Sequence, residues 1–286
     1  MGKLFRARNS QSAAAIVSGT IRSMARHESP ATAAAIAYFT LFSIFPLLLL
    51  IIAISDRYFN LFDVRSAAVR TVLRFFPGLR NFIQNSIASV QPSRGIILSC
   101  GVIVVWTVFW LVALLEAALN KAWHVTTTRH FVRSRLLALL MIYVGGSFLG
   151  ISVILTTMIT AVQQHVDEYT LAHVWGMGLL WRITFGVTAF ALTFVVFTLV
   201  YKLVPNTHVA LPEAMTAGIV ASSLWQFASF LFALLVRRMD YAAIYGPGGA
   251  FLGLLSWVYL SSYIFLFGAH LSAQMHRGAS ESLPAD

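Results

Sequence analysis

Six stretches of the sequence are too apolar and too long to fold as anything other than membrane-spanning helices. Each contains more than about 20 residues, so at about 1.5 Å per residue each crosses the roughly 30 Å hydrocarbon core of a bilayer. Inside them only Glu116 and Arg182 are formally charged, apart from Glu213 at the mouth of the fifth. The sequence therefore predicts an all-α polytopic membrane protein with six transmembrane helices. The stretches are Ala33–Ile54, Gly95–Leu119, Leu136–Val162, Trp175–Tyr201, Pro212–Val236 and Gly246–Leu271.

The composition excludes a water-soluble domain of this size, because 58% of the residues are hydrophobic, 10% are charged and the mean hydropathy is +0.78. Between the stretches the longest segment has about 40 residues, too few for an independent core. We expect one transmembrane domain over residues 33–271. A cytoplasmic amphipathic segment, residues 1–32, precedes it, and a disordered cytoplasmic tail, residues 272–286, follows.

The residues that usually carry enzyme chemistry are not grouped in this sequence. The single cysteine, Cys100, lies inside the second stretch, which excludes an internal disulfide and a thiolate metal cluster. The eight histidines show no metal-binding spacing, and no nucleophile or phosphate-loop motif is present. We therefore expect no catalytic residue, no metal and no cofactor, and a protein that is not an enzyme.

The net charge of +10 comes from basic residues at the ends of the predicted helices. Contact with anionic lipid headgroups explains this distribution better than nucleic-acid binding. Lys and Arg precede the first stretch and follow the second, whereas Asp167 and Glu168 follow the third. By the positive-inside rule, both termini are expected in the cytoplasm.

The segment over residues 56–94 is rich in arginine although this orientation places it outside. Its apolar residues fall at helical spacing on both sides of Pro77 and Gly78. Two amphipathic helices in the outer interface would explain the pattern, and so would a re-entrant hairpin covering a cavity.

Glycines four residues apart occur in the third and sixth stretches. Small residues let helix backbones approach closely in lipid, where no apolar contrast drives association. We therefore expect helix-packing roles for Gly146, Gly150, Gly249 and Gly253. Ala214, Gly218 and Ser222 form a similar stripe in the fifth stretch.

Ionisable residues inside a membrane helix normally face the bundle interior and have a partner. Glu116 lies near the cytoplasmic end of its helix and Arg182 near the outer end of another, so we do not expect them to pair. Asn120, His270 and Lys202 share the depth of Glu116. The polar residues either line a path for a polar or amphipathic solute or fix helix depth by reaching the nearest interface.

Pro46 in the first stretch removes a backbone hydrogen bond near mid-membrane, with Ser43 on the preceding turn. Such a kink either contacts a substrate or has no function. The candidate path residues are Pro46, Ser43, Glu116, Asn120, Arg182, Gln226 and His270.

Several short segments, in this order and spacing, resemble the YihY/BrkB family, some of whose members have been labelled ribonuclease BN. The resemblance implies a six-span bacterial inner-membrane protein, associated in some members with virulence. Family members commonly have Glu at the position of His270, which implies that any proton or ion role of that acid is lost here or passes to an imidazole. The segments are Ala33–Phe39, Ser43–Leu48, Leu119–Trp123, Tyr201–Pro205, Tyr245–Gly249, Trp257–Tyr259 and Gly268–Ala269.

Three functional hypotheses follow from the residues and the resemblance. The leading one is a transporter or flippase-like protein that moves a lipid-related or other amphipathic substrate in envelope biogenesis, with membrane lipids as its partners. The second is a membrane scaffold that binds an envelope protein. The third, a membrane-bound ribonuclease, is disfavoured because no catalytic group of residues is present.

Overall fold

The computed structural model describes residues 13–58, 94–125, 177–238 and 249–281. Every regular element in these ranges is an α-helix, which confirms the predicted all-α class. The helices are α2 (Ala13–Arg26), α3 (Ser29–Tyr58), α6 (Arg94–Ala122), α8 (Met177–Leu203), α9 (Leu211–Arg238) and α11 (Gly249–Glu281).

Four segments of the described helices are long and apolar enough to cross a membrane: Arg94–Ala122, Gly186–Leu203, Leu211–Leu235 and Phe251–Gly278. In α3 the apolar segment is shorter, Ser29–Ile44. The predicted third span, Leu136–Val162, and nearly all of the interfacial segment 56–94 lie outside the described residues. That the chain has six membrane spans stays a prediction.

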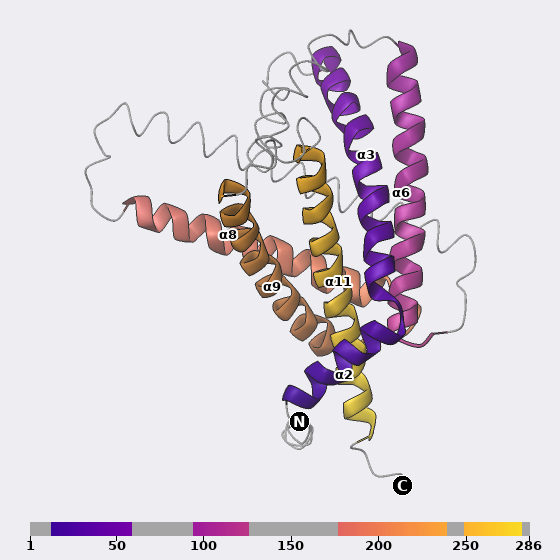
Figure 1. Cartoon of the computed structure of the whole chain (residues 1–286), viewed down its shortest axis with the longest axis vertical. Helices are drawn as coiled ribbons and strands as arrows, with labels where there is room; N and C mark the ends of the chain where they lie inside the picture. Colours follow the sequence, from indigo (N-terminus) through magenta and orange to yellow (C-terminus); the bar gives the residue numbers. More distant parts are fainter. Residues whose placement is uncertain (1–12, 59–93, 126–176, 239–248, 282–286) are drawn as a thin grey trace.

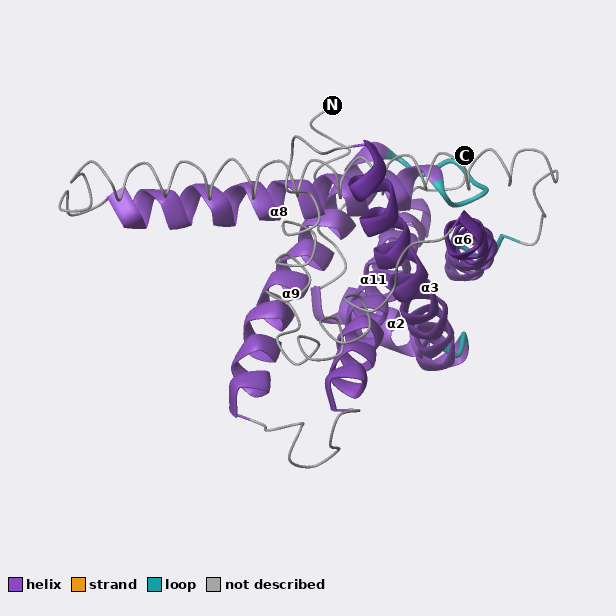
Figure 2. Cartoon of the chain, turned by 90° about the horizontal axis from the view of Figure 1, so that it is seen from above, coloured by secondary structure: helices purple, strands orange, loops and turns teal. Residues whose placement is uncertain are grey.

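The long helix α11 lies at the centre of the arrangement and contacts α2, α3, α6 and α9 (Figure 1). On one side α3 packs along α6, and on the other α9 packs on α8. Both views show α8 lying crosswise to α3 and α6, with its first turns extending away from the other helices (Figure 2). Among the described side chains of α8, those that contribute to the core are Phe197, Val200 and Tyr201.

The buried core lies where the N-terminal ends of α3 and α9 meet the C-terminal ends of α6, α8 and α11. We call this end the helix junction. Small side chains dominate it, which permits the close helix packing that association in lipid requires. Its residues are Met24, Ala33, Ile36, Ala118, Leu119, Ala122, Tyr201, Val204, Val209, Ala214, Ala217, Ala221, Phe265, Leu266 and Ala269.

The closest approaches to glycine occur at Gly268 and Gly218. A Cβ on Gly268 would lie 2.7 Å from Tyr201 Cζ, and one on Gly218 would contact Thr198 Oγ1. The stripe that includes Gly218 is thus a packing surface, as its small residues predicted. A Cβ on Gly253 would meet nothing within 4 Å, so the close approach in α11 is at Gly268. Gly249 is buried at the start of α11, and Gly146 and Gly150 lie outside the described residues.

The end of α11 differs from the sequence-based expectation. Residues 272–281, expected within a disordered tail, continue the helix to Glu281. The reason is tertiary contact: Ser272 and Ala273 are buried, and Gln274 lies against Gly19 of α2. Polar composition alone suggested disorder because it did not show that α2 would pack across this segment.

Candidate functional site at the helix junction

A carboxyl and an imidazole side chain are buried near the helix junction. Glu116 of α6 is 8% exposed, and His270 of α11 is 2% exposed. Glu116 occupies the buried face of α6 because Val112 and Leu119, one turn away on either side, are also buried. Two of the predicted path residues, Glu116 and His270, are thus both buried at this end of the structure.

His270 links three helices through its two ring nitrogens. Nδ1 lies 3.0 Å from Ser23 Oγ, at the end of α2, and Nε2 lies 3.1 Å from Ser29 Oγ, the first residue of α3. Both serines are buried, and so is the neighbouring Met24. A neutral imidazole has one donor and one acceptor, so both nitrogens are satisfied without a charge.

Two further histidines surround His270. The ring of His27 stacks on it with centroids 5.5 Å apart, and the ring of His124 meets His27 edge-on at 4.9 Å. His27 Nδ1 lies 2.8 Å from the carbonyl oxygen of Ser23. Because a carbonyl only accepts, Nδ1 carries the proton. We call His27, His124 and His270 the histidine cluster.

The backbone at the histidine cluster is strained at two points. Glu28, between α2 and α3, has φ of 54°, and His124, after α6, has φ of 53°. Residues other than glycine adopt this region rarely, and such strain gathers at functional sites. Among the described residues, no group of three His, Cys, Asp or Glu side chains is placed to hold a metal ion.

The surroundings of His124 favour a neutral imidazole. Partial burial lowers the pKa of His124 below its ordinary value of 6.5, and the positive charges of Arg277 and His27 lower it further. Arg277 Nη2 donates to Gln274 Oε1 at 3.0 Å on the same helix. A protonated His124 would therefore stand close to other cations.

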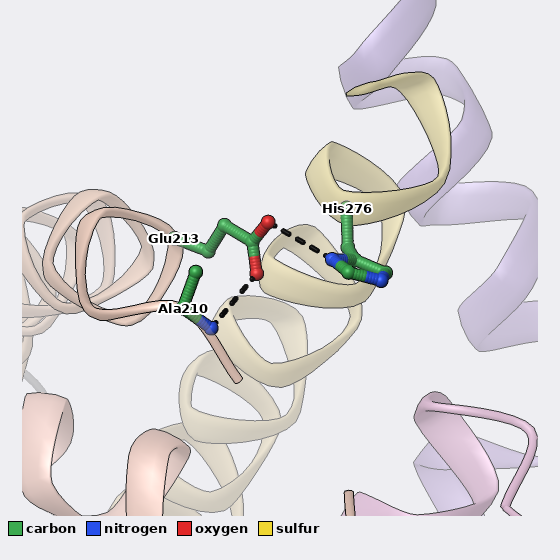
Figure 3. A network of polar contacts seen from close by, with 3 residues as sticks. All are labelled: Ala210, Glu213 and His276. Carbon is green, nitrogen blue, oxygen red and sulfur yellow. Dashed lines mark hydrogen bonds and ion pairs between the residues drawn. The ribbon is translucent and has the colours of Figure 1, made fainter. Parts of the chain in front are cut away.

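A carboxylate joins α9 to α11 at the edge of the junction (Figure 3). Glu213 Oε1 lies 2.9 Å from His276 Nδ1, and Glu213 Oε2 accepts the backbone N–H of Ala210 at 3.3 Å. A glutamate in the first turn of a helix that accepts the preceding backbone N–H caps the start of the helix. Its negative charge also interacts favourably with the positive end of the helix dipole. The ring of Trp123 lies 5.3 Å from that of His276. The contact between Glu213 and His276 therefore has a structural role.

Asn120 has a structural partner. Its Oδ1 accepts the backbone N–H of Asn206 at 2.7 Å, which ties the end of α6 to the connection after α8. We expect Asn120→Ala to destabilise the protein by about 1–3 kcal/mol, because it leaves that N–H without its acceptor. Thermal unfolding of the purified protein in detergent would measure the loss. Asn120→Asp keeps the acceptor oxygen and should lose less; equal losses would contradict this role.

The other predicted path residues lie apart from His270. Ser43 Oγ donates to the Thr40 carbonyl oxygen of its own helix at 2.8 Å, and Pro46 is half-buried within α3. Gln226 is half-buried on α9. Arg182 lies near the start of α8, at the end opposite the junction, and its side chain is outside the described residues. Glu116 and Arg182 thus occupy opposite ends of their helices, as predicted.

The sequence did not indicate His27, His124, Ser23 or Ser29 as site residues. They stand at helix ends, where polar residues usually face water or cap a helix, and no spacing relates them to His270. The packing of α2, the α2–α3 turn and the end of α6 on α11 brings them together.

The sequence comparisons agree with the motifs. Residues 20–286 match the family described as virulence factor BrkB. A UPF0761 membrane protein of Azotobacter vinelandii is 30% identical over 248 residues, which are 85% of this chain and 59% of that protein. One from Pseudomonas aeruginosa is 28% identical over 248 residues, 85% of this chain and 58% of the relative. The chain thus spans about three fifths of the length of these relatives. No solved structure matches it. The chain belongs to the virulence factor BrkB family of membrane proteins.

Proposed function

We propose that the protein is a bacterial inner-membrane transporter of the flippase type, which moves a lipid-related or other amphipathic substrate during envelope biogenesis. The observation that supports this function is the burial of Glu116 and His270 between apolar helices. Ionisable groups are expensive at such positions, and those found there commonly mark a substrate or ion pathway.

Buried hydroxyl groups support the same function. The side-chain oxygens of Thr198, Ser222 and Ser272 have no hydrogen-bond partner among the described residues. An unpaired hydroxyl in an apolar environment costs free energy that a polar group of a substrate, or water, recovers on binding. The helix junction therefore offers polar atoms at several depths to a molecule that has both a polar and an apolar part.

The expected orientation places the helix junction on the cytoplasmic side. In the structure α2 and the C-terminal end of α11 lie at the same end (Figure 1), which supports their lying on one side of the membrane. The junction would then act as the inner closure of the pathway.

A transport assay on Glu116→Gln tests this function. We expect the wild-type protein in liposomes to move fluorescent phospholipid between leaflets faster than empty liposomes do. Gln keeps the size of the side chain but removes its charge, and we expect the protein-dependent rate to fall about tenfold, or about 1.4 kcal/mol in the barrier. Dithionite quenching of the outer leaflet measures the rate.

Arg22→Gln is the control for the loss of a charge, because Arg22 is exposed on α2. It should transport at the wild-type rate. Absence of transport by correctly inserted wild-type protein, with a series of labelled lipids, would refute the proposal. Co-purification of an envelope protein in that case would favour a scaffold.

A further inference from the structure

We propose that the histidine cluster is a proton-sensitive latch: neutral His27, His124 and His270 hold α2 on the transmembrane helices, and their protonation releases it. This role goes beyond transport, and the proposal does not depend on transport being correct.

The inward face of α2 packs mainly on α11, with a smaller contact to α3. Thr20, Ser23 and Met24 are buried, whereas Val17 and Ile21 on the other face are exposed. Gly19 lies against Gln274, and Ser23 lies against His270 one turn earlier in α11. The two helices therefore run antiparallel over one short contact, and His270 is the ionisable group buried in it.

The geometry of His270 suits a neutral ring. Its two nitrogens have a hydroxyl each, from Ser23 and Ser29, and neither hydroxyl carries a negative charge that would balance an imidazolium. Stacking at 5.5 Å places the ring of His27 directly beside it. Two protonated rings in this arrangement repel each other, and burial weakens the screening of that repulsion by water.

The ionisable neighbours of His270 add to the repulsion. The groups that act on it electrostatically are cationic or become so on protonation. Glu213, at the edge of the junction, is engaged by His276 and the backbone of Ala210. The neighbours come from the α2–α3 turn, the end of α6 and the end of α11: His27, Lys121, His124 and Arg277.

The direction of the pH effect follows from His124, which lies outside the membrane-spanning segment of α6. Burial, the charge of Arg277 and, on protonation, His27 lower its pKa from 6.5 in the docked state. The part due to His27 is lost when α2 leaves, so the released state binds a proton more tightly. Docking is then complete above about pH 6.5 and weakens as the pH falls below that value. Release would uncover Met24 together with Ser272 and Ala273 of α11, and so open the inner side of the helix junction.

Distance measurements between spin labels test the latch in lipid nanodiscs. The labels are placed at Ser18→Cys on the exposed face of α2 and at Met215→Cys on the exposed face of α9, with Cys100 replaced by Ser. Between about pH 8 and about pH 5 we expect the main distance to shift or broaden by roughly 10 Å, about one helix diameter. No shift in this protein would overturn the proposal.

The variant His270→Gln distinguishes the latch from a nonspecific effect of low pH on the protein. Gln offers polar atoms to both serines but does not take up a proton in this range, so α2 should stay docked at both pH values. The same substitution at His208, which is exposed in the α8–α9 connection, should leave the full shift. A wild-type shift in His270→Gln would overturn the proposal.

A second variant covers the case in which His270→Gln does not fold. His27→Gln combined with His124→Gln keeps His270 but removes its titratable ring neighbours, and should reduce the shift by at least about half. An undiminished shift would again contradict the latch. Because the distances are measured without substrate, a failure of the latch is distinct from a failure of transport.

Discussion

Gly268→Ala is expected to destabilise the protein by about 3 kcal/mol, which is large for the addition of one methyl group. The new Cβ would lie 2.7 Å from Tyr201 Cζ and 2.9 Å from Ala221 Cβ. Neither neighbour has room to move. Tyr201 is fully buried and its hydroxyl donates to the Phe265 carbonyl oxygen at 2.8 Å, while the Ala221 Cβ is fixed to the backbone of α9. The methyl group therefore forces α8, α9 and α11 apart.

Gly253→Ala in the same helix provides the control. A Cβ there meets nothing within 4 Å, and alanine favours a helix over glycine by up to about 1 kcal/mol. Thermal unfolding in detergent should show a fall of roughly 6–12 °C for Gly268→Ala and little change or a rise for Gly253→Ala. Similar changes in both variants would contradict the close packing at Gly268.

Tyr201→Ala is expected to cost about 3–5 kcal/mol, through the cavity that it leaves. Tyr201 heads the fully buried side chains by volume among the described residues, and its ring lies 5.3 Å from that of Phe265 and 6.0 Å from that of Phe197. Tyr201→Phe keeps the ring and loses only the hydroxyl, so it should cost about 1 kcal/mol. The unfolding temperature of the two variants measures the difference, and equal losses would contradict it.

The two sites should be coupled, because the Tyr201 ring is what a Cβ on Gly268 would strike. In the double variant Tyr201→Ala with Gly268→Ala, the methyl group enters the space that the ring has left. The total loss should therefore be smaller than the sum of the single losses by at least about 1 kcal/mol. Strict additivity would show that Gly268 is tight for another reason.

The helices of the described regions follow from the sequence because their apolar runs are unambiguous. The predicted stretch Gly95–Leu119 lies within α6, and Pro212–Val236 lies within α9. The predicted ends were less accurate where packing extends a helix. Polar residues after Leu271 gave no sign that α11 continues, since the contact with α2 that stabilises them is remote in sequence.

The site was only partly predictable. Glu116 and His270 could be predicted as site residues, because an ionisable side chain in an apolar helix has a high free-energy cost in the membrane whichever helices it packs against. The serines and histidines around His270 carry no such signal, because a polar residue at a helix end needs no special explanation. Ser23 and Ser29 become significant only when α2 and α3 fold against α11.

The sequence alone determined that this chain is a helical membrane protein, since the length and apolarity of each run set its free energy in lipid independently of its neighbours. Only the tertiary structure decided which residues meet: Gly268 with Tyr201, and His270 with His27, Ser23 and Ser29. These contacts depend on how helices that are far apart in the chain cross each other. Hydropathy is a property of one helix at a time, so it holds no information about that crossing.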